Sequence, residues 1–301
     1  MTSNSYHIPV LLHAAVKGLN IQPSGIYVDV TFGGGGHSRE ILSHLDNGTL
    51  CAFDQDSDAK TNLINDSRFR FYPTNFSNLQ SALATDGIEN VNGILADLGV
   101  SSHQFDDAER GFSLRYEAPL DMRMDQQSPL SAFDVINSYE TEKLKIIFRE
   151  YGEAENAGKL AYFIGEARKQ KAISTTGELL QIIDRVAPRK KEKQYQAKIF
   201  QAIRIEVNDE MSVLRDFLQQ SLNVLSPGGR LVVISYHSLE DRLVKNFMRS
   251  GNLSGEIEKD FFGVPITPFT DLTKKPLVPD EAEIEQNPRS RSAKLRIAEK
   301  K

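Results

Sequence analysis

Residues 29–38 read Asp29-Val30-Thr31-Phe32-Gly33-Gly34-Gly35-Gly36-His37-Ser38 and give the clearest indication of the fold. It follows an apolar, β-branched run at 25–28 and leads into residues 39–45, whose apolar spacing suits a helix. A strand, a glycine turn and a helix in this order form the first half of a nucleotide-binding βαβ unit. Consecutive glycines leave the turn without side chains, so a ligand can approach the backbone and its N–H groups can face a negatively charged group.

A second strand is expected at 49–53, and it ends at Asp54, about 20 residues beyond the glycines. An acidic residue at this distance can accept hydrogen bonds from the two ribose hydroxyls of an adenosine cofactor. The alternative role for Asp54 is to cap the following helix, but Asp56 fits that position better. We therefore assign Asp54 to the ribose.

Three classes of ligand compete for the glycine turn. A P-loop would place Gly-Lys-Ser/Thr at its end, whereas His37 and Ser38 follow Gly36 here, so ATP or GTP hydrolysis is disfavoured. A dinucleotide fingerprint would require glycine where Ser38 stands, which makes NAD a poor match. S-adenosylmethionine has no pyrophosphate and needs a glycine turn beside its amino-acid end and a carboxylate on its ribose. The sequence suits this ligand best.

Further strands indicate an α/β protein with an open sheet. They are expected at 68–72, 91–99 and 230–235, with two more candidates around 266–269 and 292–298. In such a sheet the ligand binds outside the carboxyl ends of the strands. Asp29, Asp54 and Asp97 all lie near such ends, so three carboxylates are expected to line one cleft.

The middle of the chain interrupts this alternation. From 108 to 200 only helical patterns occur, and the apolar spacing from 199 to 225 indicates one long amphipathic helix. We predict an α/β domain at 1–107 and 201–301, interrupted by an all-helical insertion at 108–200.

Composition excludes several classes of protein. A single cysteine, Cys51, gives no disulfide framework and no cysteine zinc site, and six scattered histidines lack ligand spacing, so no metal is expected. The N-terminus shows no signal pattern and no run of about 18 apolar residues exists, so we expect a cytoplasmic protein without a membrane partner. A net charge of −5 argues against indiscriminate nucleic-acid binding. Basic clusters at 189–193 and 289–296 nevertheless allow a local phosphate-binding face.

A resemblance sharpens this assignment. The segment 225–235, Leu-Ser-Pro-Gly-Gly-Arg-Leu-Val-Val-Ile-Ser, looks like the late part of a class I S-adenosylmethionine-dependent methyltransferase. More specifically, the chain resembles the RsmH (MraW) family of bacterial methyltransferases that modify N4 of a cytidine in 16S rRNA. The matching segments are 7–12, 31–38, 97–102, 106–113 with Gln104 before it, 119–125, 200–205, 235–242 and 287–292.

The resemblance implies a class I methyltransferase fold, Rossmann-like with a doubly wound sheet, into which an all-helical domain is inserted. It also implies S-adenosylmethionine as the cofactor and 16S rRNA within the small ribosomal subunit as the partner. By motif match Gly35, Gly36 and His37 would hold the amino-acid end of the cofactor and Asp54 the ribose. Phe76 would pack near the adenine, and Asp97 and Gln104 would complete the pocket.

The RNA-facing residues expected from the motifs and the basic clusters are Arg110, Arg123, Lys190, Lys191, Lys198, Arg289 and Arg291. One position departs from the family. Where the family often has His-Pro-Ala-Thr-Arg before Phe-Gln-Ala, this chain ends the segment with Lys198, which lacks the bidentate geometry of arginine.

Two residues are candidates for catalysis. Many amino-methylating enzymes place Asp/Asn-Pro-Pro-Tyr/Phe after the fourth strand, whereas this chain has Asp97-Leu98-Gly99-Val100. We hypothesise that Asp97 or a nearby backbone carbonyl accepts a hydrogen bond from the target amine. Tyr236-His237 follows the fifth strand and is expected to border the same cleft, where His237 is either a proton relay or a structural histidine.

Other functions remain open at this point. A small-molecule methyltransferase would need no basic insertion, a nicotinamide dehydrogenase would bind NADH, and a scaffold protein would bind RNA without methyl transfer. Nothing in the sequence indicates a homo-oligomer.

Overall fold

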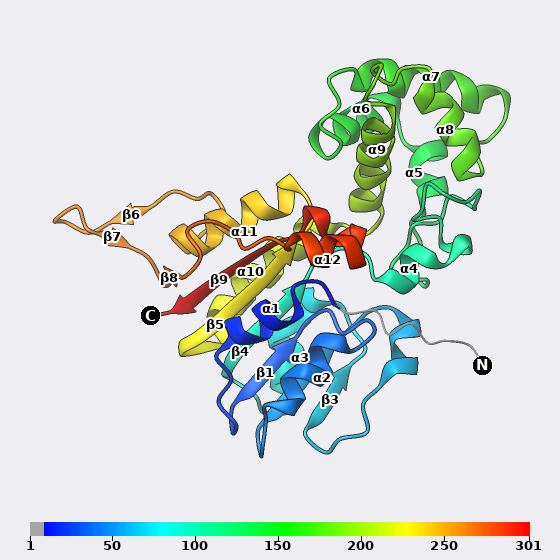
Figure 1. Ribbon diagram of the computed structural model, residues 1–301. Coiled ribbons are helices and arrows are strands. Elements are labelled where there is room, and N and C mark those ends of the chain that lie inside the picture. Colours follow the sequence, from blue (N-terminus) through cyan, green and yellow to red (C-terminus); the bar gives the residue numbers. More distant parts are fainter. Residues whose placement is uncertain (1–8) are drawn as a thin grey trace. The chain divides into compact units, whose positions relative to one another are not determined.

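The computed structural model describes residues 9–301, which fold as two compact units (Figure 1). The first unit runs to Gly99 and resumes over Ser212–Lys301, and the second is Val100–Met211. The sequence indicated boundaries after 107 and after 200. Helix α9 (Glu192–Val207) runs through residue 200 without a break, so the whole helix belongs to the second unit. Residues 7 and 8 of the first family segment lie outside the described residues.

The first unit is built on a seven-stranded sheet in the order β3-β2-β1-β4-β5-β9-β8. The first five strands in this order, β3-β2-β1-β4-β5, pair in parallel, whereas β9 is antiparallel to its neighbours β5 and β8. The order reverses between β1 and β4, and the carboxyl edge of the sheet at such a switch point is where ligands bind. The strands are β1 (Ile26–Asp29), β2 (Thr49–Phe53), β3 (Phe69–Tyr72), β4 (Val91–Asp97), β5 (Leu225–Ser235), β8 (Phe269–Asp271) and β9 (Lys294–Lys300).

Helices cover both faces of this sheet, because successive side chains of a strand point to opposite sides. In β5, Val232 and Ile234 pack among side chains of α1 (Leu12–Leu19) and α2 (Gly36–Ser43). Leu231 and Val233 pack on the other face with the second group of helices. That group is α3 (Leu79–Thr85), α10 (Glu210–Val224) and α11 (Ser238–Ser250). Each fully buried Leu, Ile or Val contributes about 1.5–3 kcal/mol, so burial on both faces stabilises the sheet.

Short elements complete the first unit. The 3₁₀ turns η1 (Ser57–Asn62) and η2 (Phe76–Asn78) follow β2 and β3. The strand candidate at 266–269 is divided between β7 (Pro265–Ile266), which pairs with β6 (Glu258–Lys259), and β8 of the main sheet. Near the end lie α12 (Glu281–Gln286) and η4 (Pro288–Ser292), and Glu283 of α12 accepts a hydrogen bond from Leu11 N at 2.7 Å.

The second unit is all-helical apart from an isolated bridge in its described residues. Its core is formed by side chains such as Phe148, Leu160 and Ile203, which are fully or almost fully buried. One of its helices begins after Thr175, whose side chain accepts from Glu178 N in a capping box. The helices before α9 are α4 (Ser102–Asp106), η3 (Ala108–Arg110), α5 (Ala132–Ser138), α6 (Thr141–Glu150), α7 (Ala157–Gln170) and α8 (Thr176–Asp184). Over residues 9–301 no helix combines the length and apolar character needed to cross a bilayer.

The long helix predicted for 199–225 is wrong, because α9 ends at Val207 and α10 begins at Glu210. Asp209 has a φ of 47°, which takes the backbone out of the helix. The side chain of Asn208 accounts for the break. Its Nδ2 donates to the Met122 carbonyl at 2.8 Å, and its Oδ1 accepts from Met124 N at 2.7 Å.

Replacing Asn208 with alanine is expected to destabilise the second unit. Asn208→Ala leaves the Met122 carbonyl and Met124 N–H without these partners, which costs roughly 1–3 kcal/mol. Urea denaturation measures the change in the free energy of unfolding. Asn223→Ala, at an exposed position, serves as the control and should change it by less than about 0.5 kcal/mol. An equal effect of the two substitutions would contradict this role for Asn208.

Candidate functional site

The glycine turn between β1 and α2 needs glycine for two separate reasons. Gly33 and Gly35 have φ values of 48° and 72°, a conformation that side chains rarely tolerate. A Cβ on Gly36 would lie 2.2 Å from Pro9 Cγ, so steric contact excludes a side chain there. Gly34 differs, because a Cβ on it would meet nothing within 4 Å. The turn therefore leaves open space beside the backbone of Gly34.

Asp54, at the end of β2, is bound to this turn. Its Oδ2 accepts from Gly33 N at 2.7 Å and its Oδ1 accepts from Asp56 N at 2.8 Å. The prediction that Asp56 caps the next element is confirmed, since its side chain accepts from Asp58 N at the start of η1. Burial raises the pKa of Asp54 to about 6. The structure thus places the acid after β2 beside the glycine turn, and its proposed role at a ribose stays a prediction.

Asp29 lies beneath the turn and is fully buried. Ser38 Oγ donates to its Oδ2 at 2.6 Å, and Thr31 N donates to its Oδ1 at 3.1 Å. Thr31 Oγ1 in turn accepts from Asp97 N at 2.7 Å. Asp29 therefore holds the start of α2 and the end of β1 together, and Thr31 fixes the end of β4 beside them.

Asp97 lies between a tyrosine and a histidine at the carboxyl edge of the sheet. Tyr236 donates its hydroxyl to Asp97 Oδ1 at 2.7 Å, and His37 Nδ1 lies 3.8 Å from Asp97 Oδ2. Burial raises the pKa of Asp97 to about 6 and raises that of Tyr236 well above its ordinary value. Burial also lowers the pKa of His37, whose Nε2 lies 3.2 Å from the Val10 carbonyl. A neutral His37 with its proton on Nε2 agrees with the lowered pKa and can donate to the Val10 carbonyl.

Tyr236 is the contact with Asp97 that sequence reasoning missed. From the sequence, Tyr236-His237 was expected to border this cleft, with His237 as either a proton relay or a structural histidine and with no role assigned to Tyr236. In the structure His237 caps α11, with Nδ1 accepting from Glu240 N at 3.4 Å. Glu240 Oε2 accepts from Tyr236 N at 2.8 Å and so fixes the same turn. His237 has this structural task, and its role as a proton relay stays a prediction.

Phe76 and Gln104, assigned by resemblance alone, lie in different units. Phe76 is half-buried in η2 and packs edge to face on Phe217, with ring centroids 5.4 Å apart. Gln104 is buried in the second unit, where its Oε1 accepts from Ser101 N at 3.0 Å in the capping box of α4. Both positions therefore have a structural role, and the proposed contacts with a cofactor stay predictions.

Several of the expected RNA-facing residues are bound within the protein. Arg110 is only 6% exposed, and its Nη2 donates to the carbonyls of Arg123 and Met124. Arg123 pairs with Asp121 at 2.7 Å, and Lys198 pairs with Glu153 at the same distance.

The other four basic residues lie nearer the surface. Lys190, Lys191 and Arg291 are exposed, and Arg289 is half-buried. Lys190 and Lys191 lie in the second unit, and Arg289 and Arg291 lie in the first.

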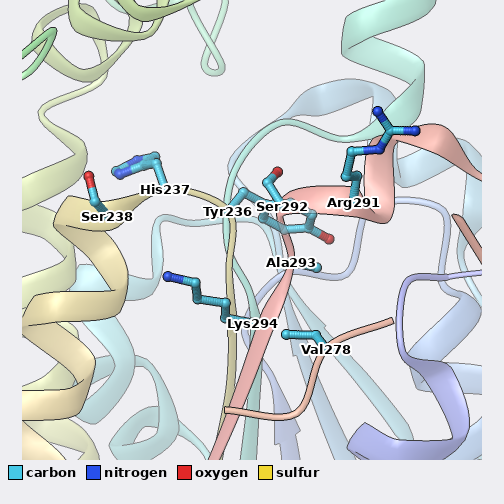
Figure 2. Close-up of a pocket in the computed structure, with 8 residues that line it drawn as sticks. All are labelled: Tyr236, His237, Ser238, Val278, Arg291, Ser292, Ala293 and Lys294. Atoms are coloured by element: carbon cyan, nitrogen blue, oxygen red, sulfur yellow. The ribbon is translucent and has the colours of Figure 1, made fainter. Parts of the chain in front are cut away.

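A pocket of about 230 Å³ opens beside Tyr236 in the first unit (Figure 2). In that view His237 and Ser238 lie on one side of Tyr236 and Arg291 and Ser292 on the other. The ring of Tyr236 thus lines the pocket while its hydroxyl contacts Asp97. The lining residues are Tyr236, His237, Ser238, Val278, Arg291, Ser292, Ala293 and Lys294.

The strand order, the glycine turn after β1 and the acids after β2 and β4 define the class I S-adenosylmethionine-dependent methyltransferase fold. The chain belongs to the MraW methylase family, whose family model matches residues 4–301.

Relatives cover nearly the full length of the chain. "Ribosomal RNA small subunit methyltransferase H" of Bacteroides thetaiotaomicron is 58% identical, over 99% of this chain and 98% of the relative. The protein of the same name from Flavobacterium johnsoniae is 56% identical, over 99% of both chains. Among solved structures, an rRNA methylase from Streptococcus thermophilus is similar with a TM-score of 0.42 and 12% identity, over 98% of both chains.

A methyl group added to Gly36 is expected to damage the turn. Gly36→Ala places Cβ against Pro9, whose neighbours are fixed because the Val10 carbonyl contacts His37 and Leu11 N donates to Glu283. We expect a loss of about 1–3 kcal/mol in the free energy of unfolding, measured by denaturation without ligand. Gly34→Ala is the matched control and should leave the stability within about 0.5 kcal/mol. Equal losses in both variants would contradict this account of the turn.

The raised pKa of Asp97 predicts a pH-dependent gain in stability for Asp97→Asn. A carboxyl whose folded pKa is raised contributes its full stability below the unfolded pKa and loses it as the pH rises through about 6. The asparagine amide still accepts from Tyr236 but carries no charge. We therefore expect ligand-free Asp97→Asn to exceed the wild type by on the order of 1–2 kcal/mol at about pH 8, and by much less at about pH 4.5.

Asp66→Asn is the control for this measurement. Arg68 lowers the pKa of Asp66 to about 2, so removing that charge should give no gain in stability at either pH. Urea denaturation at the two pH values compares the three proteins. A pH-independent difference between Asp97→Asn and the wild type would show that burial does not raise the pKa of Asp97.

Proposed function

We propose that this chain transfers a methyl group to the exocyclic N4 amine of a cytidine in 16S rRNA of the small ribosomal subunit. S-adenosylmethionine is the methyl donor, and when bound it supplies an electrophilic methyl group on its sulfonium. The observation that carries the proposal is that the glycine turn, which is open to a ligand, and the half-buried Asp97–Tyr236 pair lie at one edge of the sheet. The names of the full-length relatives support the substrate class. The motif resemblance supports N4 of cytidine.

The residues at the turn fit this cofactor. The open space beside Gly34 gives room for an amino-acid end that binds the backbone of Gly35 and Gly36 and lies near His37. Asp54 already accepts two backbone N–H groups, and an ionised carboxylate has about four acceptor positions, so it can also accept from ribose hydroxyls. Phe76, on the loop after β3, offers an aromatic surface for the adenine.

Asp97 is suited to bind the amine that receives the methyl group. Its Oδ1 is occupied by the Tyr236 hydroxyl, but 3.8 Å to His37 is too long for a hydrogen bond to Oδ2. Oδ2 can therefore accept a hydrogen bond from the N4 amine and turn the nitrogen toward the methyl group. Orientation of this kind contributes roughly 7–11 kcal/mol at best. A carboxylate with a pKa of about 6 can also take the proton that the methylated amine releases.

The pocket beside Tyr236 is our proposed site for the target nucleotide. A base must leave its stack before chemistry on its edge can occur, and a pocket lined by a tyrosine ring can receive it. Exposed Arg291 on its wall supplies positive charge for a backbone phosphate, whereas Lys294 is paired with Asp241 at 3.2 Å. The exposed pair Lys190 and Lys191 gives the second unit its own phosphate-binding position.

The direct test is methylation of small ribosomal subunits that lack the modification. The purified chain is incubated with radiolabelled S-adenosylmethionine and these subunits, and the RNA is digested to nucleosides. The proposal expects the label in N4-methylcytidine. Label in another nucleoside would overturn the site. In parallel incubations with free cytidine or small amines, label in these compounds but not in the subunits would favour a small-molecule methyltransferase. Asp97→Ala with lower cofactor affinity but unchanged turnover at saturation would remove the acceptor role of Asp97.

Removing the exposed lysine pair is expected to reduce the salt dependence of RNA binding. In Lys190→Gln/Lys191→Gln, two phosphate contacts are lost, so the slope of log affinity against log salt becomes shallower by about 1.5. The control Lys169→Gln/Lys171→Gln removes two lysines that are paired with Glu166 and Glu178. Filter binding over a range of salt concentrations measures the slopes. An unchanged slope in the first variant would show that this pair does not contact phosphate.

A further inference from the structure

A small hairpin in the first unit carries a rigid turn. Strands β6 and β7 pair antiparallel, and the hairpin tip, residues 260–264, joins them. Asp260 Oδ1 accepts from Phe262 N at 2.9 Å and from Val264 N at 2.8 Å. Gly263 has a φ of 81°, and its N–H donates a hydrogen bond to the Asp260 carbonyl, which closes the turn. Figure 1 shows this hairpin (orange) extending away from α11 and β8 of the same unit.

The fixed turn presents two aromatic rings to solvent. Phe261 is 97% exposed and Phe262 is 86% exposed, and their ring centroids lie 5.6 Å apart in an edge-to-face contact. Val264 and Ile266 continue the apolar surface, each more than half exposed. No other large apolar side chain of residues 9–301 is as exposed as either ring. Contiguous exposed apolar surface on a folded protein indicates an interaction site.

The charges around the hairpin tip decide which kind of partner it fits. The segment 256–266 carries three negative charges, on Glu256, Glu258 and Asp260, and one positive charge, on Lys259. Sites that stack RNA bases on aromatic rings combine them with a positively charged groove, which this segment lacks. Acidic residues beside an apolar anchor instead complement a partner that is basic and has an apolar pocket.

A second copy of the chain is a poorer partner. The chain carries a net charge of −5, so its copies repel one another in general. Two rings and two aliphatic side chains also bury far less than the roughly 1,200–2,000 Å² of a stable protein–protein interface. The hairpin tip is therefore suited to be one anchor among several on a large assembly, where a few aromatic residues provide most of the affinity.

We propose that the hairpin tip docks into an apolar pocket on a basic protein of the ribonucleoprotein substrate. This inference rests on the proposed function for the identity of the assembly. Phe261 and Phe262 fill the pocket, and Glu256 and Glu258 face the basic surface around it. The enzyme thereby recognises the assembled subunit through protein as well as through RNA.

The test compares binding of the full chain to assembled small subunits with binding to protein-free 16S rRNA. Phe261→Ser/Phe262→Ser is expected to weaken binding to subunits by about tenfold or more, and to leave the affinity for protein-free RNA unchanged. Ile146→Ser, at a residue 54% exposed on α6, controls for loss of an exposed apolar side chain elsewhere. Affinity for S-adenosylhomocysteine should be the same in all proteins, since the hairpin tip lies outside the cofactor turn.

A charge reversal separates protein from RNA as the partner. Glu256→Lys/Glu258→Lys should weaken binding to subunits if the docking surface is basic, whereas it would strengthen binding if RNA contacts the hairpin. Equal losses on protein-free RNA in the serine variant, or a gain in the lysine variant, would overturn the proposal in favour of base stacking. Unchanged subunit affinity in both variants would overturn it outright. A wild-type dimer that the serine variant dissociates in sedimentation would assign the hairpin tip to self-association.

These outcomes are distinct from failure of the proposed function. If subunits are methylated normally and bind both variants as tightly as the wild type, only the docking inference fails. If the wild type binds subunits through the hairpin but transfers no methyl group to their RNA, the proposed reaction fails and the docking inference stands.

Discussion

The hydrogen bond from Gly33 N to Asp54 is the contact on which the site depends. It joins the turn after β1 to the end of β2, and the buried Asp29 supports that turn from below through Ser38 and Thr31. Thr31 then positions Asp97 N at the end of β4, so one set of short contacts aligns three strand ends. Removing side chains from the turn allows this close approach, and it also leaves the backbone accessible to a ligand.

The two carboxyls that face this edge are held in a state that the protein alone does not favour. Burial raises the pKa values of Asp54 and Asp97 to about 6, so at neutral pH both are ionised at a cost in stability. Ribose hydroxyls, an amine and a sulfonium cation are the groups that would stabilise such carboxylates. Sites of this kind commonly trade stability for function.

Much of this arrangement could be predicted from local sequence. Apolar runs bounded by turns identified β1, β2, β3, β4 and β5, and the spacing of Asp54 and Asp56 assigned their different roles, of which the capping by Asp56 is confirmed. The missed features come from contacts between distant residues. The hydroxyl of Tyr236 reaches Asp97 across 139 positions, and Asn208 reaches Met122 across 86. Apolar periodicity cannot detect such contacts, so it extended one helix through the break at Asp209.

The pairing of β4 with β5 has a consequence for how the chain folds. These neighbours are separated in sequence by the whole of the second unit, which is itself contiguous and built from helices. Local helical contacts form quickly, whereas the entropy of closing a long loop slows the pairing of distant strands. If the helical unit folds early, the unfolded chain of more than a hundred residues between β4 and β5 becomes a compact body. The loop that must close when the two strands pair is then effectively shorter. The inserted unit then assists folding of the sheet. Destabilising it should slow the pairing of β4 with β5, even though no strand residue is altered.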